Sequence, residues 1–165
     1  MTQQTFSGED FSRRFRNALG MFATGITVVT TRSPAGEAIG LTVNSFNSVS
    51  LDPPLIVWSL SNDLPSRSVF EGCEYYAINV LAEDQAELSQ RFASRLDDKF
   101  AGLDFETGVG GIPLLKGCCA RFECRNTVRH EGGDHLVFIS EVLSFDREDR
   151  QPLLYFAGGY RRLAG

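Results

Sequence analysis

Two long segments joined by a short turn constrain the fold of this chain more than any other feature. In residues 119–130 apolar side chains alternate with charged ones, and residues 135–145 continue after the turn as a second long strand. Because successive side chains of a strand point to opposite faces, the alternation predicts a sheet with one face exposed to water. The intervening EGGD has the composition of a tight hairpin turn. The pair therefore predicts an antiparallel hairpin.

Further strands are predicted along the chain, and most of them are linked as hairpins. The β-branched segment 26–31 and the segment 38–43 flank SPAGEA, a turn that contains Pro and Gly. The other predicted strands are residues 55–60, 75–81 and 152–156. Residues 101–117 are rich in Gly and contain Pro113, so they predict a loop.

A first helix is predicted near the N-terminus by an apolar stripe at helical spacing. The stripe consists of Phe11, Phe15, Ala18, Leu19 and Phe22. Ser7 and Asp10 have the spacing of a capping box, and Phe6 and Phe11 have the spacing of a hydrophobic staple. A second helix is predicted over residues 83–96, and residues 66–72 are compatible with a short one.

These elements make the fold class mainly β with flanking helices. Six or seven strands, mostly linked as hairpins, predict an antiparallel sheet or small barrel and not an alternating β/α fold. With 165 residues, of which 42% are hydrophobic, the chain is expected to form a single domain over residues 1–165.

Charge and hydropathy exclude several classes of function. A protein that binds nucleic acid would show a basic face, and the net charge of −5 argues against one. No apolar run approaches the ~20 residues of a membrane span. The N-terminus lacks the basic and apolar regions of a signal peptide. A cytoplasmic protein without a membrane-spanning segment is therefore expected.

Motifs for phosphate binding, nucleophilic catalysis and metal binding are missing from the sequence. No Gly-rich turn opens a helix after a strand, and there is neither a Walker-type loop nor a nucleophile elbow. His130 and His135 bracket a turn, but no third ligand accompanies them at metal spacing. The four cysteines lack a paired C-x-x-C spacing. They are expected to be free thiols that fill small apolar spaces.

The stretch 42–50, within LTVNSFNSVSLDPP (41–54), is the strongest local signal for a binding site. It carries six small polar side chains and no formal charge before Asp52. Hydroxyls, amides and backbone N–H groups at a strand end can bind an anion or the rim of a heterocycle. A polar edge strand with local side-chain-to-backbone turns explains the same residues. The residues alone leave both interpretations open.

Five segments carry a family resemblance: FRNALGMFATGITVVTT (15–31), GLTVNSFNSVSLDPPLIVWSL (40–60), AINVLAEDQAELSQRFA (77–93), GGDHLVFISEV (132–142) and PLLYFAGGYRRL (152–163). Together they resemble the short-chain NAD(P)H:flavin reductase family, the reductase components of two-component flavin monooxygenases. The resemblance covers nearly the whole chain in order, and the T-x-N-S-F-x-S-V-S-x-D-P-P run and the G-D-H turn are specific to the group. It implies the FMN-binding split barrel, an antiparallel Greek-key barrel that works as a homodimer.

The resemblance implies a flavin site along the polar stretch. The positions that match contacts of the isoalloxazine ring are Thr42, Val43, Asn44 and Ser45. Those nearer the ribityl chain and phosphate are Ser48, Val49 and Ser50, followed by Ser59, Ser61 and Ser66 at the phosphate end. Arg67 is the candidate charge partner of the phosphate. Phe92 and Lys99 match the far end of the flavin, although Phe92 is equally compatible with a core position.

The resemblance also implies a site for the nicotinamide nucleotide. His135, in the G-D-H turn, and Tyr160, in GGYRRL, match family positions that contact this nucleotide. The paired glycines before Tyr160 would let the backbone approach a ligand closely. Arg161 and Arg162 either steer the dinucleotide phosphates or are solvated.

The implied reaction passes a hydride from NADH or NADPH to FMN or FAD, so the protein requires no acid–base pair of its own. Donors of residues 42–45 would stabilise the charge of the reduced ring. Reduced flavin would then diffuse to a partner flavin-dependent monooxygenase. Two alternatives stay open: reduction of another acceptor, such as a cobalt corrinoid or a ferric complex, and a flavin-binding module without turnover.

Overall fold

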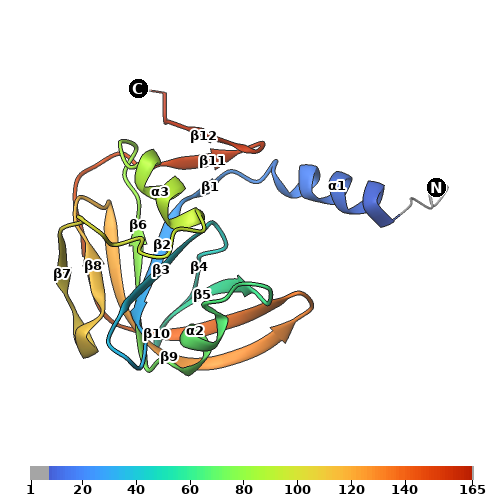
Figure 1. Ribbon diagram of the computed structural model, residues 1–165. Helices are drawn as coiled ribbons and strands as arrows, with labels where there is room; N and C mark the ends of the chain where they lie inside the picture. Colours follow the sequence, from blue (N-terminus) through green and yellow to red (C-terminus); the bar gives the residue numbers. More distant parts are fainter. Residues whose placement is uncertain (1–7, 165) are drawn as a thin grey trace.

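A seven-stranded antiparallel sheet forms the body of the protein (Figure 1). The structure is a computed structural model in which residues 8–164 are described. The strands of this sheet are β2 (Thr27–Arg32), β3 (Ala38–Val43), β4 (Asn47–Leu51), β5 (Pro54–Ser61), β6 (Tyr75–Val80), β9 (Ala120–Gly132) and β10 (His135–Arg147). Their order is β3-β2-β6-β9-β10-β5-β4. Because β5 returns to lie beside β10, the strands β5, β6, β9 and β10 form a Greek key.

The two edge strands of this sheet, β3 and β4, follow each other directly in the sequence. The sheet curls until its two edges approach each other, and residues 44–46 cross from one edge to the other. β3 contacts β5, but within residues 8–164 no strand ladder joins β3 to β4 or β5. The predicted antiparallel split barrel is therefore confirmed, with residues 44–46 at the split.

Trp58 lies at the centre of the barrel core and has no exposed surface. Along β5, Ile56, Trp58 and Leu60 are buried, while the residues between them are partly exposed, as alternation requires. The Trp58 ring stacks on Phe138 with 4.5 Å between centroids and meets Tyr76 edge-on at 5.5 Å. Each such pair contributes ~0.5–1.5 kcal/mol beyond the burial of area. The predicted buried strand is confirmed as β5.

A smaller layer covers one end of the barrel (Figure 1). It contains α3 (Ala86–Ala93) and a three-stranded sheet of β1 (Thr24–Gly25), β11 (Leu154–Phe156) and β12 (Gly159–Arg161). Phe92 of α3 belongs to a second core cluster with Val28, Leu115 and Leu153. A short helix, α2 (Arg67–Gly72), buries Phe70 in the cluster around Trp58.

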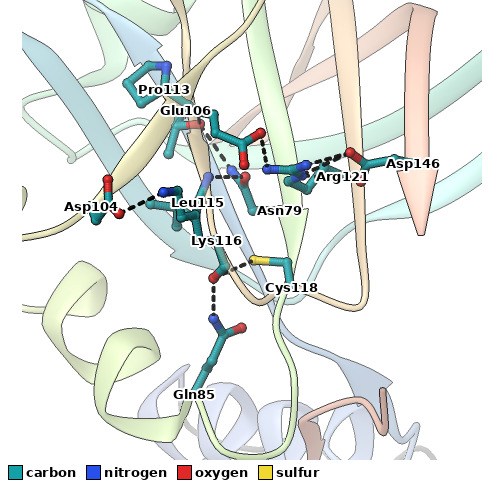
Figure 2. Close-up of polar contacts among 11 residues, drawn as sticks. Asn79, Gln85, Asp104, Glu106, Pro113, Leu115, Lys116, Cys118, Arg121 and Asp146 are labelled. Carbon is teal, nitrogen blue, oxygen red and sulfur yellow. Dashed lines mark hydrogen bonds and ion pairs between the residues drawn. The ribbon is translucent and has the colours of Figure 1, made fainter. Parts of the chain in front are cut away.

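Residues 101–117, predicted as a loop, contain two paired strands, so this prediction is wrong. β7 (Phe105–Thr107) pairs with β8 (Pro113–Leu115), and a 3-10 turn, Val109–Gly111, lies between them. Buried polar side chains attach this pair to the main sheet. Thr30 Oγ1 donates to the Pro113 carbonyl at 2.5 Å, and Asn79 Oδ1 accepts from the Leu115 N–H at 2.9 Å (Figure 2). The pairing depends on contacts distant in sequence, which local composition does not reveal.

The predicted helix over residues 83–96 is shorter in the structure, where α3 covers Ala86–Ala93. Ala82 forms an isolated bridge with Pro152, and residues 83–84 form a turn, so the helix begins only at Ala86. Ser94 ends the helix with extended backbone. The sequence also does not predict β1 and β12, which are short.

α1 (Gly8–Leu19) projects from the barrel, and none of its residues is buried (Figure 1). The predicted apolar stripe is present, but Phe11, Phe15 and Phe22 are 56%, 54% and 71% exposed. The helix ends before Phe22, which the stripe includes. The predicted capping box and staple involve Phe6 and Ser7, which lie outside the described residues. An apolar helix face of this size is typical of an interaction site.

All four cysteines are free. Burial raises the pKa of Cys118 and of Cys124 to about 12, so both stay protonated at neutral pH. Among the described residues, no helix is long and apolar enough to span a membrane. Nor do His, Cys, Asp and Glu side chains of residues 8–164 form a group of three that could hold a metal ion.

Candidate functional site

The uncharged polar stretch lies at the split of the barrel. Thr42 and Val43 end β3, and the exposed Asn44 follows them. β4 is an edge strand and contains Ser48, Val49 and Ser50, so the interpretation as a polar edge strand describes this part. Residues 42–45 line the gap between the two edges, where strand backbone has no sheet partner on one side. The interpretation as a polar edge strand therefore describes residues 47–51, and the interpretation as a binding site stays a prediction for residues 42–45.

The Ser45 side chain bridges part of the split. Its Oγ donates to the Ser59 carbonyl at 3.1 Å and accepts from the Ser59 N–H at 3.0 Å. Asn47 of β4 pairs with Val57 of β5, so Ser45 takes the place of a backbone partner where β4 has not yet begun. The only donor of this hydroxyl is used within the protein. A ligand at the split would therefore meet the backbone of Ser45 and not a free hydroxyl donor.

The backbone of Thr42 faces the open edge of β3. The Ile26 carbonyl accepts from the N–H of Leu81, which directly follows β6. Because hydrogen bonding alternates along a strand, Val28, two residues on, directs its backbone groups to the same side, toward β6. Thr42 pairs with Val28, and its own N–H and C=O must then point away from β2. Together with the exposed side chain of Asn44, they form an uncharged set of donors and acceptors.

Phe92 and Lys99 attach α3 to β3. Phe92 has no exposed surface, and its ring occupies the space where a Cβ on Gly40 would come within 2.6 Å of it. Of the two interpretations of Phe92, the structure shows the core position. Lys99 Nζ donates to the Phe92 carbonyl at 2.9 Å and to the Gly40 carbonyl at 3.4 Å, which satisfies a carbonyl at the end of α3. Partial burial lowers the pKa of Lys99.

Arg67, the candidate partner of a phosphate, already has partners. Its Nη2 lies 2.9 Å from Glu131 Oε1, and its Nε lies 3.8 Å from Glu71 Oε2. Ser66 precedes α2 and makes no side-chain cap hydrogen bond, and Ser61 ends β5. A phosphate at this end of the site would thus meet serines and a cation whose charge is already compensated.

His135 begins β10 at a hairpin corner, and Asp134 holds its ring. Nδ1 lies 2.6 Å from Asp134 Oδ1, and this contact lowers the pKa of the Asp134 carboxyl. The Asn62 N–H donates to the Asp134 carbonyl at 2.9 Å, which ties the corner to the end of β5. In the antiparallel register His135 lies opposite Ser61. With Nδ1 engaged, Nε2 is the ring nitrogen available to a ligand.

Tyr160 is tied to α3 through a residue that the sequence does not single out. Its hydroxyl lies 2.9 Å from Oγ of Ser89, which is fully buried. The Ser89 carbonyl accepts from Thr42 Oγ1 at 2.7 Å. A serine on the inner side of a short helix has the same sequence pattern as any small core residue, so only the fold reveals this link. The structure therefore brings the predicted residues Thr42 and Tyr160 together.

A cavity of about 420 Å³ lies beside Tyr160. Its lining residues are Glu83, Ala86, Leu153, Tyr160, Arg161 and Arg162. Arg162 Nε lies 3.9 Å from Glu83 Oε2, and Arg161 donates to the Tyr160 carbonyl at 2.8 Å. Both arginines are exposed, so these contacts leave them accessible to an anion.

His135 and Tyr160 are not neighbours within one chain. β12, which carries Tyr160, lies beyond α3 at the top of Figure 1, whereas the turn between β9 and β10 lies at the lower right. A nucleotide that contacts both residues of one chain would have to extend along the split.

Another cavity, of about 520 Å³, lies away from the predicted site residues. Arg32, Cys73, Glu74 and Tyr75 are among its lining residues. It opens where β2 ends and β6 begins, at the opposite end of the β2–β3 hairpin from Thr42. No residue predicted to contact the flavin or the nucleotide lines this cavity.

Comparison with known proteins identifies the class to which this fold and site belong. Residues 19–164 match the flavin reductase like domain family. The FMN reductase (NADH) SmoA of Agrobacterium fabrum is 46% identical over 157 residues, which cover 95% of this chain and 89% of that protein. The reductase subunit HsaB of a Rhodococcus jostii flavin-dependent monooxygenase is 41% identical over 150 residues, with coverages of 90% and 76%.

A solved structure gives the same result. The NADH:FAD oxidoreductase SgcE6 of Streptomyces globisporus, in complex with NAD and FAD fragments, superposes with a TM-score of 0.89 at 34% identity and covers 98% of each chain. The chain therefore belongs to the flavin reductase like family. It is an oxidoreductase whose cofactors are a flavin and a nicotinamide nucleotide.

The exposed amide of Asn44 provides a direct test of the site. Asn44→Ala is expected to raise the Kd for FMN about 2- to 10-fold, because it removes one hydrogen bond of ~0.5–1.5 kcal/mol. Quenching of flavin fluorescence during titration measures this Kd. Asn47→Ala is the matched control, since the Asn47 amide oxygen accepts from the Ser48 N–H within β4. Equal Kd values for wild type and Asn44→Ala would contradict the assignment of this residue.

Proposed function

We propose that this protein is an NAD(P)H:flavin reductase that binds FMN or FAD along the split and releases the reduced flavin to a partner monooxygenase. The observation that carries the proposal is the meeting of the two sheet edges at residues 42–45, with open backbone groups and without a formal charge. The reductase subunit HsaB of the Rhodococcus jostii monooxygenase supports the choice of partner. We place the protein in the cytoplasm.

The residues at the split fit the rim of an isoalloxazine ring. The N–H and C=O of Thr42 and the amide of Asn44 supply both donors and acceptors, as a ring with alternating N–H and C=O groups requires. When bound, the flavin supplies the hydride acceptor. The fixed N–H dipoles of the chain would stabilise negative charge on the reduced ring without reorganisation.

The remaining predicted contacts extend this site in both directions. Ser48, Val49 and Ser50 on β4 and Ser59, Ser61 and Ser66 beyond it would follow the ribityl chain and phosphate. At the other side, Lys99 lies at the base of α3 within reach of the β3 edge. We assign His135 and Tyr160 to the nicotinamide nucleotide, and Arg161 and Arg162 to its phosphates.

The same arrangement favours release of the flavin after reduction. The donors of the Thr42 and Ser45 hydroxyls are engaged within the protein, and Arg67 is compensated by carboxylates. No ion pair between a free cation and the flavin phosphate therefore strengthens binding at residues 61–67. We infer a modest affinity, which suits a flavin that acts as a substrate and diffuses to a second protein.

We infer that the protein works as a homodimer in which α1 packs on the second copy. Phe11 and Phe15 stack at 5.8 Å between centroids on a helix without buried residues, and a second copy presents further apolar surface at Phe145, which is 72% exposed. Sedimentation analysis should report a dimer for the wild type. Phe11→Asp/Phe15→Asp should yield a monomer, whereas Arg16→Gln on the same helix should remain dimeric. A monomeric wild type would contradict this inference.

Oxidation of NADH and NADPH, followed by absorbance with and without added FMN, FAD or riboflavin, tests the proposed function. We expect oxidation that depends on added flavin and saturates with it. No oxidation with any flavin would contradict an enzymatic role and favour a binding module. Oxidation that ignores added flavin but follows an added ferric or corrinoid acceptor would instead support a flavin-bound reductase of that acceptor.

A further inference from the structure

Ser89 occupies a position at which a hydroxyl group is costly unless it has a partner. It lies in the middle of α3 and has no exposed surface. A buried hydroxyl without a hydrogen bond destabilises a protein, whereas alanine would fill the same space without this cost. Its hydroxyl and its carbonyl are both hydrogen-bonded to residues far away in the sequence.

These two contacts join the two halves of the predicted site. The Ser89 carbonyl accepts from Thr42 Oγ1 at 2.7 Å, and its Oγ lies 2.9 Å from the Tyr160 hydroxyl. Thr42 ends β3 at the split, and Tyr160 lies in β12 of the smaller sheet. One residue of α3 therefore contacts both the flavin wall and the predicted nucleotide contact.

The helix that carries Ser89 is held firmly in place. The Phe92 ring packs onto Gly40 of β3, and Lys99 joins the end of the helix to the same strand. At its beginning, the Gln85 amide donates to the Lys116 carbonyl at 2.8 Å (Figure 2). The Tyr160 hydroxyl is therefore held in place relative to β3, through Ser89 and α3, and not by the β1–β11–β12 sheet alone.

We propose that Ser89 is a positioning residue that sets the distance and orientation of Tyr160 relative to the flavin wall at Thr42. This proposal rests on the function proposed above. Because the Tyr160 hydroxyl is paired with Ser89, Tyr160 presents its ring, and not its hydroxyl, to the nicotinamide nucleotide. The ring is also set by Tyr155, which it meets at 6.0 Å between centroids and 69° between planes. Loss of the hydroxyl pair would leave the ring held by this aromatic contact and by its packing against the second core cluster.

Ser89→Ala separates the two contacts, since it removes the hydroxyl but keeps the carbonyl that Thr42 uses. We expect it to raise KM for NADH about 2- to 10-fold, the factor that corresponds to one hydrogen bond. The value of kcat and the Kd for FMN should stay unchanged. Tyr160→Phe should have the same effect, and the double variant should be no worse than either single variant, because both remove the same pair. Ser94→Ala is the matched control, because it removes a hydroxyl that donates to the Arg91 carbonyl and accepts from the Leu96 N–H, and contacts neither Thr42 nor Tyr160.

The outcomes separate this proposal from the function on which it rests. If the effects of the two substitutions on KM were additive, loss of the Ser89–Tyr160 hydrogen bond could not be the cause of the raised KM, and the proposal would be overturned. Coupling between them in urea denaturation with an unchanged KM would show a structural role only and would overturn the proposal. A wild type that oxidises no NADH with any flavin would overturn the proposed function, and this proposal with it.

Discussion

The gap between β3 and β4 is the constraint on which the rest of this structure depends. Consecutive strands form the two opposite edges of one sheet, so residues 44–46 must cross an opening that no ladder among the described residues 8–164 closes. Backbone groups along such edges need partners. Ser45 supplies one through its hydroxyl, and the edge of β3 at Thr42 is left open. The unpaired strand edges therefore explain both the polar side chain that bridges the split and the open backbone groups that can hold a ligand.

The absence of formal charge at the split links this architecture to the chemistry. A neutral rim can hold an isoalloxazine ring by hydrogen bonds without binding it as tightly as an ion pair would. The two cations predicted for the flavin site already have partners: Arg67 pairs with Glu131, and Lys99 caps α3. The reaction itself takes place between two cofactors, so the chain has to orient them and let one of them leave. Ser89 connects Thr42 with Tyr160, the residues to which we assign contacts with these two cofactors.

The sequence predicts the long hairpins, the buried strand and the class of fold, because these depend on local alternation and turn composition. It does not predict the β7–β8 pair, whose attachment comes from Thr30 and Asn79, both distant in sequence. For the site, the family motif identifies the stretch at residues 42–50. It does not reveal that the hydroxyls of Thr42 and Ser45 are used internally, or that Ser89 matters, because these facts depend on tertiary contacts.

Hydrogen–deuterium exchange with and without FMN tests the central claim that the split is the flavin site. We expect slower exchange in peptides covering residues 40–50 and 59–61, because a ligand there would cover the open strand edges. Exchange around the cavity of Arg32 and Tyr75 should be unchanged by FMN. Protection confined to that cavity, with unchanged exchange at residues 40–50, would contradict the account.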